Sequence, residues 1–116
     1  MRRTATACFV LLFSLVSFSV LAGEGPLKLP EGANPSAVMH NDEGIAAWNK
    51  GDYRSALMHF SEASRIEPSG ETHFNEAIAL DKLGRHGEAA MHFKAAKKHA
   101  NGNPKILKSR ILNAHL

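Results

Sequence analysis

One stretch of this sequence occurs twice. GDYRSALMHFSEA at residues 51–63 returns 33 positions later as GRHGEAAMHFKAA at residues 84–96. The identical pairs are Gly51 and Gly84, Ala56 and Ala89, Met58 and Met91, His59 and His92, Phe60 and Phe93, and Ala63 and Ala96. The same shift aligns His40 with His73. A repeat of roughly 20 to 50 residues is typical of proteins that stack one supersecondary unit on the next.

Each copy predicts a glycine turn followed by a helix. Ala56, Phe60 and Ala63 lie at i, i+4 and i+7, the spacing that places residues on one face of a helix, and the second copy repeats it. The small residues let two helix backbones approach each other while the phenylalanine fills the space between them. Pro68 cannot continue a helix and ends the first unit. The unit is therefore helix, glycine turn, helix.

Capping signals mark where the helical region begins and where its last helix starts. Asn34-Pro35 and Asn103-Pro104 each offer a capping side chain followed by proline at the first helical position. The second signal precedes an apolar face that would cover the open end of a stack. Its residues are Ile106, Leu107, Ile111, Leu112 and Leu116. We expect helices at about residues 35–50, 52–66, 70–83, 86–100 and 103–115.

The pattern resembles the tetratricopeptide repeat. The likeness lies at Gly44, Ala47, Gly51, Asp52, Tyr53, Ala56, Phe60, Ala63, Ile66 and Pro68, and again at Ala77, Leu80, Gly84, Ala89, Phe93 and Ala96. It implies an all-α fold of antiparallel helix pairs stacked as a short solenoid, with repeats at residues 35–68 and 69–102 and a capping helix at 103–116. The chain departs from the family at His40 and His73, where a large aromatic residue is frequent, and at Glu43 and Glu76, where leucine is frequent.

The first 22 residues have the pattern of a secretory signal peptide. Arg2 and Arg3 precede an apolar run of about 15 residues, which is short for a membrane-spanning helix, and small residues follow it. We expect cleavage before Gly23, a linker at residues 23–34 and a soluble periplasmic or secreted protein. An uncleaved membrane anchor is the alternative. Cys8 is the only cysteine, so the mature chain would hold no disulfide and no thiolate site.

The charge is uneven along the chain. Without Arg2 and Arg3 the basic residues number 14 − 2 = 12 against 11 acidic ones, which gives no argument for nucleic-acid binding. Residues 23–81 hold 4 basic and 10 acidic residues, and residues 82–116 hold 8 basic and 1 acidic. Solvated helix faces would explain this difference. A self-assembling adaptor, a homo-oligomer driven by the charge asymmetry, is an alternative function.

The sequence contains no pattern that indicates an enzyme, and no cofactor is expected. A nucleophile–base pair, paired catalytic carboxylates and a phosphate-binding glycine loop are all missing from it. The 7 histidines are its unusual feature. The pattern favours half-buried packing residues, so no metal site is predicted. A periplasmic protein that handles a metal or cofactor through His40, His59, His73 and His92 is the alternative.

The resemblance implies that the first helix of each pair lines a binding groove. The outward residues of those helices would be Asn41, Ile45, Trp48, Asn49, Phe74, Ile78, Asp81 and Lys82. An exposed Trp48 among apolar neighbours would act as the anchor for a partner. The sequence thus predicts a non-enzymatic scaffold or adaptor in the bacterial cell envelope that binds a protein or peptide.

Overall fold

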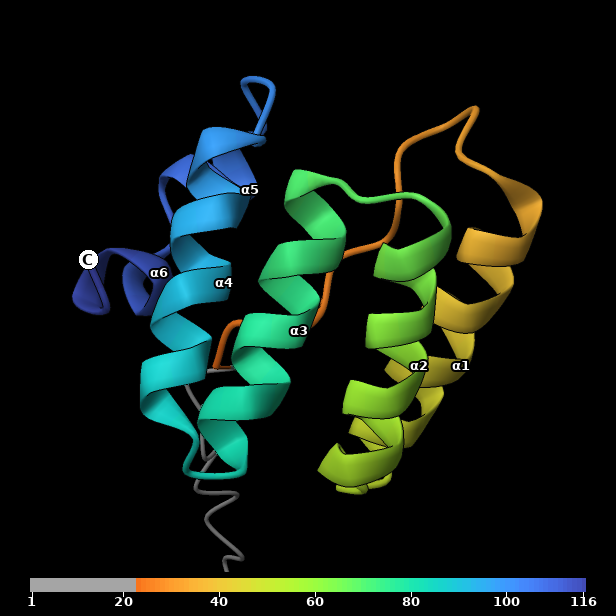
Figure 1. The fold of residues 1–116 in the computed structure, drawn as a ribbon, viewed down its shortest axis with the longest axis horizontal. Coiled ribbons are helices and arrows are strands. Elements are labelled where there is room, and N and C mark those ends of the chain that lie inside the picture. Colours follow the sequence, from red (N-terminus) through yellow and green to blue (C-terminus); the bar gives the residue numbers. More distant parts are fainter. Residues whose placement is uncertain (1–22) are drawn as a thin grey trace, which may run out of the picture.

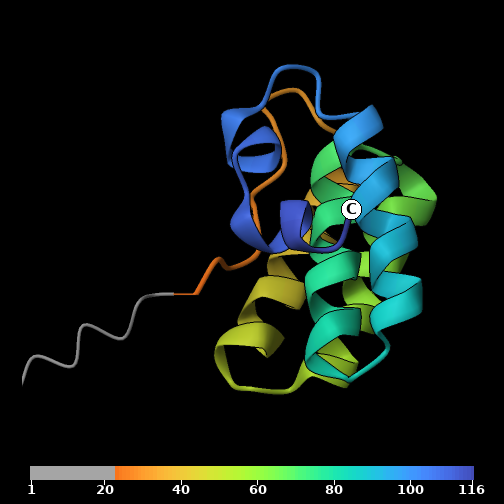
Figure 2. The same ribbon diagram turned by 90° about the vertical axis from the view of Figure 1, so that its left-hand side faces the viewer.

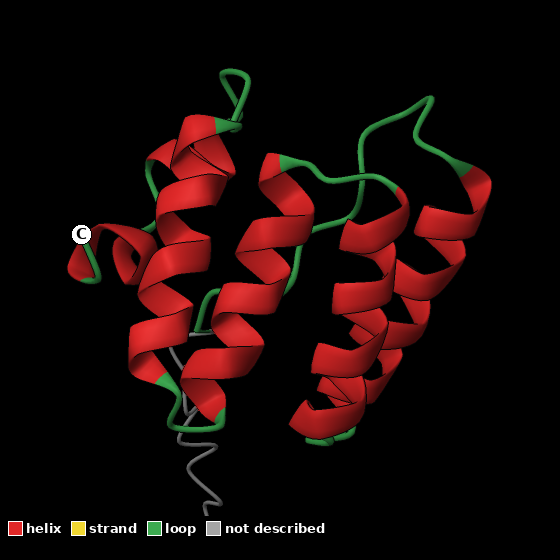
Figure 3. Cartoon of the chain, viewed as in Figure 1, coloured by secondary structure: helices red, strands yellow, loops and turns green. Residues whose placement is uncertain are grey.

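The chain is all-helical over the residues that the computed structural model describes, 23–116. The helices are α1 (Pro35–Asn49), α2 (Tyr53–Ile66), α3 (Gly70–Lys82), α4 (His86–Lys98), α5 (Pro104–Leu107) and α6 (Arg110–Ala114). Loops join them, and no strand occurs among these residues (Figure 3). Within this part of the chain no helix combines the length and the apolar content that crossing a bilayer requires. The predicted signal peptide lies outside the described residues.

Side chains next to the helices fix where the long helices begin. The Asn34 side chain accepts a hydrogen bond from the Ser36 backbone N–H at the start of α1, and Asp52 accepts one from Ser55 at the start of α2. Ser69 and Thr72 form a reciprocal capping box at the start of α3. These bonds satisfy N–H groups that have no partner inside the helix.

The four long helices pack in pairs, as the repeat predicts. Helix α1 packs against α2 and α3 against α4, and α2 joins the two pairs by packing against α3 (Figure 1). Phe60 and Phe93 are fully buried at equivalent places in the two pairs. The Phe93 ring meets Phe74 edge-on, with 5.9 Å between centroids. Helix α3 is enclosed on most sides, and 10 of its 13 residues are buried.

The C-terminal helix expected at residues 103–115 needs correction, because the structure divides it into α5 and α6. Ser109 separates the two and caps α6 through a hydrogen bond from the Leu112 N–H. The Glu24 carboxylate, far away in sequence, accepts the N–H groups of Arg110 and Ile111. The break therefore gives α6 a capped start of its own. Only part of the expected apolar face is buried: Ile106 and Leu112 are inside, while Leu107 and Leu116 are exposed.

The close contact between α1 and α2 leads to a paired prediction on two helical glycines. A Cβ at Gly44 would lie 2.5 Å from two ring carbons of Phe60, whereas a Cβ at Gly87 in α4 would meet nothing within 4 Å. Gly44→Ala should therefore cost about 1–3 kcal/mol through overpacking. Gly87→Ala should be neutral or stabilise the fold by up to about 1 kcal/mol, since alanine favours helix. Urea unfolding of both variants measures this, and equal effects would contradict the packing of α1 on α2.

Candidate binding face and histidine clusters

Residues 23–34, which we call the strap, cross the face formed by α1 and α3. The strap has no regular secondary structure. In Figure 2 it is the orange segment that runs beside α5 and α6. Its first part is fixed at α6 by Glu24, and the Asn34 N–H at its other end donates to the Glu67 carboxylate. The segment expected as a linker is thus attached to the helices near both of its ends.

Two asparagines hold the main chain of the strap at Leu27. The Leu27 N–H donates to Asn75 Oδ1 at 2.7 Å. Its carbonyl accepts from Asn41 Nδ2 at 2.9 Å and from Asn75 Nδ2 at 2.8 Å. Asn75 Nδ2 also donates to Asn41 Oδ1 at 2.8 Å, and both asparagines are fully buried. We call this network the Leu27 clamp. It satisfies both backbone groups of Leu27, which is itself partly buried, through two side chains that are fully buried.

The predicted groove residues divide into two groups. Asn41, Phe74 and Ile78 were expected to face outward, and this is wrong: they are 0%, 1% and 1% exposed. The strap contacts Asn41 through the Leu27 carbonyl, and Leu27 packs against a core cluster that contains Phe74 and Ile78 together with Ile106 and Leu112. The strap and the C-terminal helices thus turn this face into an interior. The remaining predicted residues stay partly or fully accessible, namely Ile45, Trp48, Asn49, Asp81 and Lys82. Sequence reasoning missed Asn75, although an amide within an apolar helical stretch was a signal that it has a specific partner.

Trp48 lies at the edge of this face and is half-buried. Its ring meets Tyr53 edge-on with 4.9 Å between centroids, and the Lys82 ammonium lies 5.9 Å from its centroid. A hollow of about 360 Å³ beside it is also lined by Gly23, Glu24 and Ile111. The indole therefore borders the place where the strap enters the fold.

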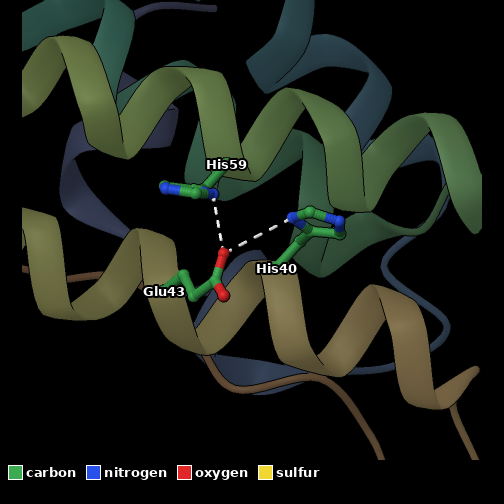
Figure 4. Close-up of side chains that lie close together, drawn as sticks. All are labelled: His40, Glu43 and His59. Atoms are coloured by element: carbon green, nitrogen blue, oxygen red, sulfur yellow. Dashed lines mark ion pairs between the residues drawn. The ribbon is translucent and has the colours of Figure 1, made fainter.

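The first histidine cluster joins α1 and α2. Glu43 Oε2 is 3.0 Å from His59 Nδ1 and 3.6 Å from His40 Nδ1 (Figure 4). The two rings are stacked with centroids 5.9 Å apart. His40 and Glu43 are three residues apart on one helix, and His59 faces them from the partner helix. The side chains of His40 and His59 are 26% and 28% exposed, so solvent reaches the cluster from one side.

The second cluster occupies the equivalent place between α3 and α4. His73 Nδ1 and His92 Nδ1 are 3.1 Å apart, and His73 Nδ1 is 3.9 Å from Glu76 Oε1. His99 stacks on His73 at 6.3 Å. Burial lowers the pKa of the His73 imidazole, and the neighbouring His92 and His99 lower it further against the opposing effect of Glu76. The lowered pKa favours the neutral form of the His73 imidazole at pH 7.

A third cluster has a different character. One oxygen of Asp81 is 2.6 Å from His86 Nδ1 and 2.8 Å from His115 Nε2. Burial raises the pKa of the Asp81 carboxyl, but the hydrogen bonds from the two histidines outweigh it and hold the pKa below its ordinary value. This one oxygen thus accepts from both histidines, and it ties His115 near the C-terminus to the end of α3.

The lowered pKa of Asp81 predicts a pH effect on stability. A depressed carboxyl pKa stabilises the fold at pH values above the unfolded pKa, about 3.9, and this contribution is lost as the pH falls through the folded value. Asp81→Asn should lower the free energy of unfolding at pH 7 by on the order of 1 kcal/mol. The gap between wild type and variant should narrow as the pH falls below about 4. Urea unfolding at pH 7 and pH 3.5 measures it, and a constant gap would contradict the assignment.

No family model matches the chain, and neither the curated proteins nor the solved structures gave a match. The function is therefore inferred from the Leu27 clamp, the helix pairs and the clusters themselves.

Proposed function

We propose that this chain is a non-enzymatic scaffold of the tetratricopeptide type that binds an extended polypeptide on the face of α1 and α3. The observation that carries the proposal is the Leu27 clamp, in which two buried asparagines hold an extended backbone by its N–H and its carbonyl. Main-chain hydrogen bonds of this kind provide affinity for any extended segment, and the neighbouring pockets select its side chains. The resemblance to the tetratricopeptide repeat implies that the first helices of stacked pairs together form a face of this kind.

The partner that fits this face has an apolar residue at the position of Leu27. That side chain packs against the core cluster that contains Phe74 and Ile78. A charged residue there would lose its hydration without gaining an opposite charge. We expect the partner to be an extended segment with a leucine-like residue at its centre. The proposal keeps the cell-envelope location that residues 1–22 predict.

The strap is a competitor for this face. A segment tethered in the same chain acts at an effective concentration on the order of millimolar, so a free peptide of equal quality is excluded from the intact protein. A partner must therefore bind this face more tightly than residues 23–34 do, or bind it while the strap is detached. Weakening the strap without changing the face should therefore open the binding site.

A peptide in trans tests the proposal. The probe is a fluorescein-labelled peptide of residues 23–32, measured by anisotropy with the chain that begins at Gly23. Wild type should bind it weakly. Leu27→Asp in the protein, which disfavours the strap by about 1.5–3 kcal/mol, should tighten binding by at least about tenfold. Circular dichroism confirms that this variant keeps its helices.

Two controls make the result specific. Glu31→Ala alters an exposed strap residue and should leave the affinity at the wild-type level. Leu27→Asp combined with Asn75→Ala should lose the gained affinity, because the clamp is then missing its central amide. A peptide that binds none of these chains, or binds as well without Asn75, would show that the face does not receive an external polypeptide.

A further inference from the structure

We propose that His73, Glu76 and His92 form a binding site for a divalent transition-metal ion. An equivalent second site lies in the first helix pair at His40, Glu43 and His59. In each set the three ligand atoms lie within 4.8 Å of one another. The proposal is independent of the polypeptide-binding face, since none of these six residues belongs to the Leu27 clamp.

The second cluster has the spacing of metal ligands. Two nitrogen ligands of a tetrahedral ion with bonds of about 2.0–2.1 Å are separated by about 3.3 Å. His73 Nδ1 and His92 Nδ1 are 3.1 Å apart, and Glu76 Oε1 is 3.9 Å from the first of them. Glu76 also approaches the other ring nitrogen of His92, with Oε2 3.6 Å from Nε2. A turn of the Glu76 carboxylate toward the two Nδ1 atoms would fill three of the four positions of such an ion. The fourth position would be left for water or another ligand.

Unpartnered buried atoms point to the same two clusters. Among residues 23–116 only two buried side-chain nitrogen or oxygen atoms lack a hydrogen-bond partner, and they are His40 Nδ1 and Glu76 Oε1. The Glu76 side chain is 9% exposed. A buried carboxylate oxygen without a partner costs on the order of several kcal/mol. An ion bound in each cluster, between its carboxylate and its imidazoles, would give each orphaned atom a partner.

The first cluster repeats the second at the sequence shift that relates the two helix pairs. His40, Glu43 and His59 correspond to His73, Glu76 and His92 at a shift of 33 positions. Glu43 Oε2 lies 3.0 Å and 3.6 Å from the two imidazole nitrogens (Figure 4). The helix spacing places His and Glu on one face of the first helix, and the pairing of the helices brings the second His to them.

The third cluster supplies the contrast. Asp81 accepts from both His86 and His115 at hydrogen-bond distance, and none of its atoms is orphaned. The three ligand atoms of this cluster also lie within 4.8 Å of one another, but, unlike the other two clusters, it has no buried atom that lacks a hydrogen-bond partner. This difference makes His86, which is exposed, a matched control for the two proposed sites.

The ligand types of each cluster indicate which metal ions it would bind. Two imidazole nitrogens and one carboxylate suit Zn²⁺, Cu²⁺ and Ni²⁺, whereas Mg²⁺ and Ca²⁺ need more oxygen ligands. Affinity should follow the usual order, with Cu²⁺ tighter than Zn²⁺. Three protein ligands and partial exposure would give an exchangeable ion rather than an enclosed structural one.

The test is calorimetric titration of ZnCl₂ and CuCl₂ into the tag-free chain that begins at Gly23. MgCl₂ is the negative control and should not bind. We expect two ions per wild-type chain, one in His92→Ala, one in His59→Ala and two in His86→Ala. The electron paramagnetic resonance spectrum of the Cu²⁺ form should show coupling to two imidazole nitrogens per ion.

The two proposed sites are supported if wild type binds two ions and His59→Ala and His92→Ala each bind one fewer. Fewer than two ions in wild type, an unchanged number in either His59→Ala or His92→Ala, or loss in His86→Ala would overturn it. Peptide binding of the strap-weakened chain is measured separately, so failure of one proposal leaves the other standing on its own result.

Discussion

Deletion of residues 103–116 should give a chain that aggregates at physiological temperature. The deletion removes Ile106 and Leu112, which are fully buried against the second helix pair. Each contributes roughly 1.5–3 kcal/mol by burial, and domains of this size are stable by only about 5–15 kcal/mol. It also leaves Glu24 without the N–H groups of α6 and so loosens the strap. Thermal unfolding and light scattering measure the outcome.

Point variants separate loss of burial from loss of the whole segment. Ile106→Ala and Leu112→Ala should each destabilise the fold by about 2–5 kcal/mol, as is usual for buried aliphatic residues. Leu107→Ala is the matched control, because Leu107 is 42% exposed. A truncated chain with the wild-type thermal midpoint would contradict the capping role of α5 and α6.

Asn75→Leu should be the other large effect. Leucine has the same branched arrangement of four side-chain heavy atoms, although its methyl groups are larger, and it can neither accept from the Leu27 N–H nor donate to the Asn41 carboxamide oxygen. Two buried groups would then lack partners, each at a cost of about 1–3 kcal/mol. The free energy of unfolding should therefore fall by about 2–6 kcal/mol. Urea unfolding gives this number directly.

Asn49→Leu provides the comparison, since Asn49 is an exposed residue of α1. It should change the free energy of unfolding by less than about 0.5 kcal/mol. If Asn75→Leu were equally mild, the clamp would not hold the strap in solution.

The helix pairs were predictable because their signals are local. The glycine turn, the capping residues and the Ala-Phe-Ala spacing all act within one or two helical turns, and they occur twice in phase. The bounds of the first four helices accordingly fall close to the predicted ones. Burial of Phe60 and Phe93 follows from the same spacing.

The binding face was not predictable in the same way, because its cover comes from a distant segment. Leu27 and Asn75 are 48 residues apart, and nothing in the composition of residues 23–34 indicates that they dock on α3. The break between α5 and α6 likewise involves Glu24, 86 residues before Arg110. Contacts between residues so far apart in sequence depend on how all the helices pack together, and no short stretch of sequence carries that information.

The histidines fall between these two cases. The i and i+3 spacing of His40 with Glu43, and of His73 with Glu76, places each pair on one helix face. The third member of each cluster comes from the partner helix, so its position requires the packing of the pair. The expectation that the histidines are half-buried agrees with the structure for His59 and His92, while their contacts with the glutamates emerge only from the folded chain.

Hydrogen exchange at the Leu27 amide reports whether the Leu27 clamp forms in solution. We expect this N–H, bonded to the buried Asn75 side chain, to be strongly protected in the isolated chain that begins at Gly23. We also expect an excess of an extended peptide that displaces the strap to remove the protection. Nuclear magnetic resonance reports this single site. A Leu27 amide that exchanges at the rate of an unstructured chain before any peptide is added would show that the clamp does not form and would contradict the account.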